Sequence, residues 1–391
     1  MEKYRTLILA GFGAMGQGFC ILGSRLLTGF EDIIILDIQN KDTSIIPGAV
    51  FLKGDVQDLN FLTNVLEGVK RDFVFVNLCS CTDNYRIRII VSQYGGAYID
   101  TACSMMFQKA EYRYSRLMPY TFQATENEKP HLICCGINPG MVEIIARKMI
   151  LDYFPGGEQF DIFLYEYDEF QTNLPGEEIG VSWSPETLID EIMLSPTFRI
   201  LQGQEVEGEN APSDEVKSHM NGHWLDSRLV GHEELWNFGL IPGVKVENAF
   251  YSYAFRSEIM EVLAGEVDEA KRQLVIPGQE ITIKGVDTVA VEVVERSSGV
   301  SHTLVWATDH LICQERWGIN AVQFQVSSSL LVFLELLLQI NEWDKGKLLC
   351  ASTLPIEKFG WRYIDDLMIQ YGVEWESGET LDCRLERGKL A

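Results

Sequence analysis

Short apolar runs alternate with segments of helical length along the first 140 residues of this 391-residue chain. The runs occupy residues 6–10, 33–36, 49–52, 73–77, 97–100 and 131–134. Strands that are apolar throughout and alternate with helices are typical of a parallel, doubly wound sheet that is covered on both faces. The pattern therefore predicts an N-terminal α/β domain.

From about residue 160 the pattern changes to an alternation of apolar and polar positions. It is clearest in residues 160–167, 280–284, 289–295 and 303–308. A period of two predicts half-buried strands of an antiparallel sheet with one solvent-exposed face. Residues 203–223, with three glycines, a proline and several charges, predict a long surface loop. We therefore expect a second domain of the α+β type.

The length of the chain is sufficient for two domains. We expect residues 1–140 to form the first and residues 141–319 to form the second. A helix near residues 321–340 has a broad apolar face, so we expect residues 320–391 to pack back on the first domain.

The first apolar run leads directly into a complete G-x-G-x-x-G turn, residues 11–16. Gly11 permits the tight reversal from strand to helix, Gly13 lets backbone amides approach a pyrophosphate, and Gly16 allows close helix packing. Asp37 ends the second run, 21 residues beyond Gly16, where a carboxylate can accept hydrogen bonds from ribose hydroxyls. That carboxylate would repel a 2′-phosphate. The turn therefore predicts a Rossmann domain that binds NAD rather than NADP, and the alternative is a glycine-rich turn that binds no nucleotide.

Polar residues at the ends of the other strands should lie at the rim of the same cofactor site, because ligands of such sheets bind beyond the carboxyl ends of the strands. The residues expected to contact NAD are Gly11, Gly13, Ala14, Met15, Gly16, Asp37, Asp55, Asn77, Ser80, Asp100, Thr101, Asn138 and Pro139.

The formal net charge is −25, and residues 151–300 contribute −20 of it, with 29 acidic and 9 basic residues. Such a charge argues against nucleic acid or an anionic membrane as a partner. The acidic segment is either a solvated surface or a source of a field that attracts cations.

Nine cysteines without a C-x-x-C or a zinc-like spacing predict reduced thiols and no metal site. Residues 1–10 do not resemble a secretory signal and the longest apolar stretch is too short to span a bilayer, so we expect a cytoplasmic protein.

An aromatic side chain between carboxylates is the strongest candidate for a substrate site. Glu166 and Asp168 share one face of an expected strand. Ser184 is a good N-cap, so Trp183 should lie just outside the N-terminus of a helix on which Glu191 follows. Such a site would suit an alkylammonium group through cation–π attraction and charge-assisted hydrogen bonds. The alternative is a core tryptophan beside a solvated helix.

Two further residues are candidates. Asn138 precedes a proline at a strand end, where its amide can project into the cofactor site or simply complete a turn. Arg256 follows an aromatic strand in the acidic segment and can bind a substrate carboxylate or pair with Glu258 or Glu261. The histidines have no spacing typical of a triad or a metal site, and we interpret them as structural or surface residues: His219, His223, His232, His302 and His310.

Taken in order, these motifs resemble the saccharopine dehydrogenase-like superfamily and, within it, the bacterial homospermidine synthases. The segments with the resemblance are the glycine turn, Asp37, residues 98–101, residues 135–142, Glu166, residues 182–184 and residues 325–330. The resemblance implies NAD chemistry on putrescine or a related amine. A hydride leaves the carbon beside the amine, the imine exchanges its nitrogen with a second amine, ammonia is released, and the hydride returns. It also implies that Asn138 borders nicotinamide and substrate, that Glu166 and Glu191 bind ammonium groups, and that Trp183 provides the cation–π face.

The chain departs from that pattern at two places. Residues 102–104 read Ala-Cys-Ser where the synthases have a glutamate, and Phe255-Arg256 replaces a histidine. A lost acid and a gained arginine would suit a carboxylated amine, so one alternative is an imine reductase of the carboxyspermidine or saccharopine dehydrogenase type. Another is a non-catalytic NAD-binding sensor. A symmetric homodimer is the oligomer expected from general frequency.

Overall fold

The computed structural model of the protein describes residues 4–69, 72–103, 114–123, 129–210, 215–220, 223–278, 280–340 and 348–377. The chain divides into two compact units. Unit 1 comprises the described residues within Met1–Met105, Leu117–Met141 and Gln323–Val373, and unit 2 comprises those within Met106–Arg116, Val142–Val322 and Glu374–Ala391.

Unit 1 contains a seven-stranded sheet in the order β19-β6-β5-β4-β1-β2-β3, and all of its pairings are parallel. This confirms the predicted doubly wound sheet. The strand order reverses between β1 and β4, which is the switch point where ligands of such sheets bind. The strands are β1 (Thr6–Ala10), β2 (Asp32–Asp37), β3 (Val50–Lys53), β4 (Phe73–Asn77), β5 (Ala97–Asp100), β6 (His131–Leu132) and β19 (Leu348–Leu349).

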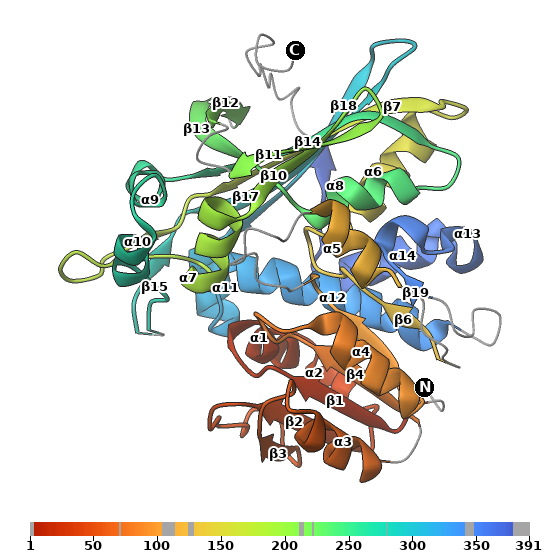
Figure 1. The fold of residues 1–391 in the computed structure, drawn as a ribbon, viewed down its shortest axis with the longest axis vertical. Helices are drawn as coiled ribbons and strands as arrows, with labels where there is room; N and C mark the ends of the chain where they lie inside the picture. Colours follow the sequence, from red (N-terminus) through yellow and green to blue (C-terminus); the bar gives the residue numbers. More distant parts are fainter. Residues whose placement is uncertain are drawn as a thin grey trace. The chain divides into compact units, whose positions relative to one another are not determined.

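Helices flank this sheet (Figure 1), and the local sequence explains where they begin. The carboxylate of Asp58 accepts hydrogen bonds from the first amides of α3, and Asp83 does the same for α4. The helices are α1 (Ala14–Leu22), α2 (Ser24–Leu27), α3 (Leu59–Glu67), α4 (Asn84–Gln93), α13 (Ile356–Phe359) and α14 (Trp361–Gln370). Three more have residues in both units: α5 (Tyr114–Thr121), α6 (Met141–Tyr153) and α12 (Ala321–Gln339).

Helix α12 is the predicted apolar helix near the C-terminal end of the chain. Within unit 1, the hydroxyl of Ser327 donates a hydrogen bond to the carbonyl of Met15 on α1 at 3.4 Å. Its length and mean hydropathy of 1.7 would also pass for a membrane span, but 78% of its most apolar window is buried within the protein. Such burial is typical of a core helix.

Unit 2 is built on a nine-stranded sheet whose main path is β11-β10-β14-β7-β17-β18-β20, with β13 and β12 added beside β14. Its strands are β7 (Gln159–Asp168), β10 (Pro196–Leu201), β11 (Gln204–Asn210), β12 (Glu215–Met220), β13 (His223–Val230), β14 (Lys245–Phe255), β17 (Val286–Glu295), β18 (Ser301–Asp309) and β20 (Glu376–Ser377). The two-stranded pairs are β8 (Gln171–Thr172) with β16 (Ile283–Lys284) and β9 (Ile179–Gly180) with β15 (Leu274–Val275). The helices are α7 (Pro185–Ile189), α8 (Glu233–Asn237), α9 (Ser257–Leu263), α10 (Val267–Gln273) and α11 (His310–Trp317).

Two predictions for this unit are wrong. The sheet is mixed rather than antiparallel, because β7 and β14 pair in parallel. Residues 249–255 of β14 are buried in succession, so this strand shows no alternation. The predicted surface loop at residues 203–223 instead forms β11, β12 and the start of β13, while residues 211–214 and 221–222 lie outside the described residues. Strand β11 is at the edge of the sheet as far as the structure describes it, and Glu205 and Glu209 on it are exposed, so its sequence resembles that of a surface loop.

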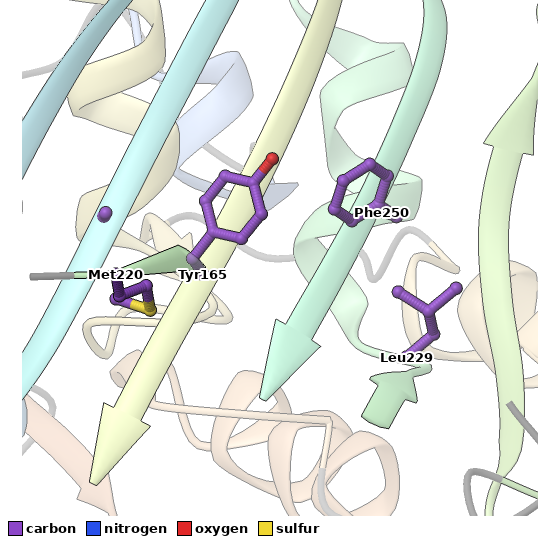
Figure 2. Close-up of a cluster of buried hydrophobic side chains, with 5 residues drawn as sticks. Tyr165, Met220, Leu229 and Phe250 are labelled. Atoms are coloured by element: carbon purple, nitrogen blue, oxygen red, sulfur yellow. The ribbon is translucent and has the colours of Figure 1, made fainter. Parts of the chain in front are cut away.

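A cluster of buried side chains packs the β12–β13 hairpin against one face of this sheet. Tyr165, Met220, Leu229 and Phe250 belong to it (Figure 2), and the rings of Tyr165 and Phe250 meet edge to face with centroids 5.6 Å apart. Successive residues of a strand point to opposite faces. Glu166 therefore projects from the face of β7 opposite to this apolar cluster.

Candidate functional site

The turn after β1 has the backbone geometry that its glycines predict. Gly11 has a φ of +89°, and a Cβ there would lie 2.7 Å from the backbone that follows β4. A Cβ at Gly16 would lie 2.2 Å from the carbonyl oxygen of Gly11. At Gly13, the N-cap of α1, a Cβ would meet nothing within 4 Å. The turn is closed at Gly11 and Gly16 and open at Gly13, so a phosphate can approach the amides of Ala14 and Met15.

Asp37 lies beside this turn and is fixed by the backbone. Its two carboxylate oxygens accept hydrogen bonds from the amides of Phe12 and Gln39, each at 2.8 Å. A carboxylate has about four acceptor positions, so it retains the capacity to bind ribose hydroxyls. The open turn and the anchored carboxylate together fit a dinucleotide. Further along the same sheet edge, Asp55 and Thr101 are half-buried and Ser80 is exposed.

Asn77 and Asp100 form a hydrogen-bonded network beneath that edge. The amide of Asn77 donates to the Asn84 carbonyl oxygen at 2.9 Å and to the Tyr98 hydroxyl at 3.0 Å. The carboxylate of Asp100 accepts from the Tyr98 hydroxyl and from the amide of Cys134, both at 2.9 Å. Both side chains are buried. The structure therefore places these two expected cofactor contacts where they support the strand ends, and their contact with NAD stays a prediction.

The loop after β6 is a compact turn with Asn138 and Pro139 at its tip. The amide of Gly136 donates to the Pro139 carbonyl at 2.8 Å, and the Met141 amide donates to the Gly136 carbonyl at 3.0 Å. The Asn138–Pro139 peptide bond is cis. Asn138 itself is half-buried at the carboxyl edge of the sheet. The turn is thus well defined structurally and also leaves the asparagine at the edge where a cofactor contact is expected.

Unit 2 contains the second group of candidate residues, which we call the acidic cluster: Glu166, Glu191, His232, Glu233 and Glu234. The imidazole Nδ1 of His232 is hydrogen-bonded to Glu234 and lies 3.4 Å from a carboxylate oxygen of Glu233, while its Nε2 lies 3.6 Å from Glu191. Three carboxylates thus lie within 4 Å of a single imidazole.

Tyr251 of β14 connects Glu166 to the rest of this group. Its hydroxyl donates a hydrogen bond to Glu166, and its ring meets the ring of His232 edge to face, with centroids 5.3 Å apart. Burial, followed by the charge of Glu166, raises the pKa of Tyr251 well above its usual range, so the phenol stays a donor. The parallel pairing of β7 and β14 places Glu166 opposite Tyr253. Tyr251 lies two residues before Tyr253 on β14 and points to the same face.

The acidic cluster strongly perturbs its own protonation. Burial, together with the repulsion from Glu166, Glu233 and Glu234, outweighs the attraction of His232 and raises the pKa of Glu191 to about 8. Burial lowers the pKa of His232, but the surrounding carboxylates outweigh it and raise this pKa well above the usual value. One oxygen of Glu191 and one of Glu234 are buried without a hydrogen-bond partner among the described residues. The cluster is therefore short of positive charge and of donors, which is an environment that suits a cation.

A buried network holds the segment that supplies Trp183 and Glu191. The hydroxyl of Ser182 donates to Asp168 at 2.5 Å, and the amide of Asn320 donates to the Ser182 carbonyl at 2.6 Å. His310 Nδ1 accepts from a backbone amide at 3.1 Å, so its proton is on Nε2, which donates to Asp168 at 3.1 Å. This network fixes the chain immediately before Trp183.

The predicted start of the next helix is confirmed. Ser184 accepts a hydrogen bond from the Thr187 amide at 3.2 Å, and Pro185 is the first residue of α7. After Ile189 the helix widens into a π-turn, Asp190–Leu194, which contains Glu191. Trp183 is half-buried just before α7. Such π-turns are frequent at functional sites, because they redirect individual side chains.

Arg256 lies at a different place in unit 2. It lines a pocket of about 670 Å³ with Arg228, Trp224 and Tyr167, and no member of the acidic cluster is among its lining residues. The predicted pairing with Glu258 is long, at 4.0 Å, and Glu261 lines the same pocket. The structure thus places Arg256 in a pocket that Glu166 and Glu191 do not line.

His232 is the residue that sequence analysis missed, since its interpretation as a structural or surface residue does not fit its place in the acidic cluster. The sequence His232-Glu233-Glu234 at the start of α8 was a usable signal, because it places an imidazole directly beside two carboxylates. Each offers one ligand atom, and these atoms lie within 4.8 Å of one another, a spacing that also suits a metal ion. Of the other histidines, His302 stacks on Tyr153. The side chains of His219 and His223 lie outside the described residues.

The sequence matches no protein-family model and no curated protein. The fold is similar to that of homospermidine synthase from Legionella pneumophila, solved in complex with NAD, with a TM-score of 0.76 and 17% identity over 97% of this chain and 92% of that one. It is also similar to saccharopine dehydrogenase (L-Glu forming) from Saccharomyces cerevisiae, with a TM-score of 0.60 and 10% identity over 96% and 100% of the two chains. The resemblance seen in the motifs is thus confirmed as a likeness of fold.

Proposed function

We propose that this protein is an NAD-dependent enzyme of polyamine metabolism, which transfers an aminobutyl group between diamines through an imine and releases ammonia. The observation that supports this most is the acidic cluster, in which three carboxylates lie around one imidazole and Glu166 adds a fourth negative charge near Glu191. A diammonium ligand such as putrescine would bring the positive charge and the hydrogen-bond donors that the cluster lacks. A cytoplasmic location agrees with this chemistry.

The cofactor assignment rests on unit 1. The open position at Gly13 and the anchored carboxylate of Asp37 fit the pyrophosphate and the adenosine ribose of NAD. The similar synthase from Legionella pneumophila was solved with NAD. When bound, NAD accepts a hydride from the carbon beside the amine and returns it to the exchanged imine, so no net oxidation results.

The residues of unit 2 would bind and deprotonate the amines. Glu166, Glu191 and Glu234 would accept hydrogen bonds from ammonium groups, and Trp183 would provide a cation–π face. An amine must be neutral before it attacks an imine. Glu191, whose pKa is about 8, and His232 beside it are suited to take up and return that proton near neutral pH.

The alternative substrate, a carboxylated amine, has less support. It would require a cation beside the acidic cluster, and Arg256 instead lines the separate pocket near Trp224. A sensor without catalysis is also less well supported, because a surface for signalling does not need three carboxylates around a single imidazole.

The test is to incubate the purified protein with putrescine and NAD and to measure amines, ammonia and NADH. We expect homospermidine and ammonia in equal amounts without accumulation of NADH. NADH that accumulates in step with product would indicate a net dehydrogenase, and the absence of any product would favour the sensor.

Two variants, one in the π-turn and one in α7, test whether the activity depends on the acidic cluster. Glu191→Gln should lower kcat/KM for putrescine, whereas the matched control Glu186→Gln should not, because Glu186 is exposed in the first turn of α7. Activity that is lost on treatment with a chelator and restored by a divalent metal would show that His232, Glu233 and Glu234 hold a metal ion instead of an amine.

A further inference from the structure

Unit 2 contains a polar pocket, which we call the arginine pocket. It has a volume of about 670 Å³ and lies between the β12–β13 hairpin, the end of β14 and helix α9. Its charged lining residues are Lys217, Asp226, Arg228, Arg256 and Glu261. The balance of these charges is positive within a segment, residues 151–300, whose net charge is −20.

The guanidinium of Arg256 is the least satisfied of these groups. Its Nε is buried and has no hydrogen-bond partner among the described residues. The guanidinium also lies 4.0 Å from the exposed carboxylate of Glu258, which is a long ion pair. A buried donor without a partner destabilises the free protein, and an oxyanion bound in the pocket would supply a partner for this guanidinium. A planar guanidinium fork matches the two oxygens of a carboxylate.

The rest of the lining is largely aromatic and apolar. Trp224 lines the pocket with half of its side chain exposed, at 51%. Tyr167 and Phe255 add two further rings, and Leu225 and Met260 add aliphatic surface. Aromatic side chains offer a surface on which a flat ring can pack, and neighbouring cations can bind an anionic substituent of that ring.

The pocket is distinct from the acidic cluster. Tyr167 follows Glu166 directly on β7, so the two side chains point to opposite faces of the sheet. Tyr167 and Leu225 also pack against the apolar cluster around Tyr165 and Phe250 (Figure 2). Of the other lining residues, Arg228 and Phe255 pair with Tyr253 and Asp168 and so project from the face of Glu166, but no residue of the acidic cluster lines the pocket.

We propose that the arginine pocket binds a small aromatic carboxylate, whose carboxylate pairs with Arg256 and whose ring packs on Trp224. This inference does not depend on the proposed polyamine chemistry, because none of its residues belongs to the acidic cluster.

The test is calorimetric titration of the full chain with 2-naphthoate and with its neutral analogue 2-naphthamide. We expect naphthoate to bind at one site and at least about tenfold more tightly than the amide, as one charge-assisted bidentate pair would give. Saturating putrescine should leave the naphthoate affinity unchanged. Equal affinity for acid and amide, or no binding of either, would overturn the proposal.

Variants locate the site. Arg256→Gln and Trp224→Ala should each weaken naphthoate binding by about tenfold, with unchanged thermal unfolding. Arg272→Gln is the matched control, because Arg272 is an exposed arginine outside the pocket that pairs with Glu269. If the control weakens binding as much as Arg256→Gln does, the acid binds through general charge and the pocket assignment fails.

Discussion

Putrescine binding should release protons, and Glu191 should be their main source. In the free protein, burial and neighbouring carboxylates raise the pKa of Glu191 to about 8, so this carboxyl group is mostly protonated at neutral pH. An ammonium group bound next to it favours the ionised form and lowers its pKa. The change to test is Glu191→Gln, which retains the shape and the neutral state of the protonated side chain and removes the ionisation.

The magnitude follows from the pKa. At pH 7, a group with a pKa of about 8 is protonated in about nine molecules of ten, so complete ionisation on binding releases about 0.9 proton. At pH 9 only about one molecule in ten has that proton, so release falls to about 0.1. The release should therefore decrease as the pH rises through 8, and the Gln variant should lack this component at every pH.

The assay is isothermal titration calorimetry at pH 7 and pH 9 in buffers with different ionisation enthalpies. The dependence of the observed heat on buffer enthalpy gives the number of protons released. Protons that come from putrescine itself are common to both proteins and cancel in the comparison, and Glu186→Gln serves as the surface control. Equal proton release by the wild type and by Glu191→Gln at pH 7 would refute the reasoning.

Three other predictions test different parts of the molecule. Gly13→Ala should weaken NAD binding without lowering Tm, because its Cβ enters open space at the helix N-terminus. Gly16→Ala should instead lower Tm, because its Cβ would lie 2.2 Å from a carbonyl oxygen. Differential scanning fluorimetry and NAD titration distinguish the two variants. Trp183→Ala should raise KM for putrescine roughly 3- to 30-fold and leave the Kd for NAD unchanged, as loss of a cation–π contact predicts; loss of NAD binding instead would make Trp183 structural. Asp168→Asn should destabilise the protein by about 3 kcal/mol in urea unfolding, since two hydrogen bonds to a buried carboxylate are weakened, and an unchanged unfolding midpoint would contradict this.

The sequence predicted unit 1 well, because the information there is local. Each strand of the parallel sheet is a short apolar run, and the glycine turn and Asp37 follow directly from two of them. Only β19, a two-residue strand beside β6, was missing from the prediction. Two residues have no periodicity that a sequence pattern can show.

Unit 2 was predicted less well, because its site depends on pairing between distant strands. The acidic cluster combines Glu166 of β7, Glu191 of the π-turn and His232 before α8, and Tyr251 of β14 connects them. The parallel pairing of β7 with β14 brings Glu166 next to Tyr251, and β14 shows no alternation because its residues 249–255 are buried in succession. The sequence analysis did single out Glu166, Trp183 and Glu191 as candidates, but it did not include His232 or Tyr251.

The two interpretations of the acidic segment can now be separated by residue. Glu177 and Glu205 are exposed and belong to a solvated surface, whereas Glu166 and Glu234 are 4% and 0% exposed. Burying several carboxylates around one imidazole is costly unless a ligand contributes positive charge. Glu191 reduces this cost in the free protein by holding a proton near neutral pH, and it can give up and take back that proton once an amine is bound. We therefore infer that the property that keeps the free site stable, a proton on Glu191, is also the one that amine exchange requires.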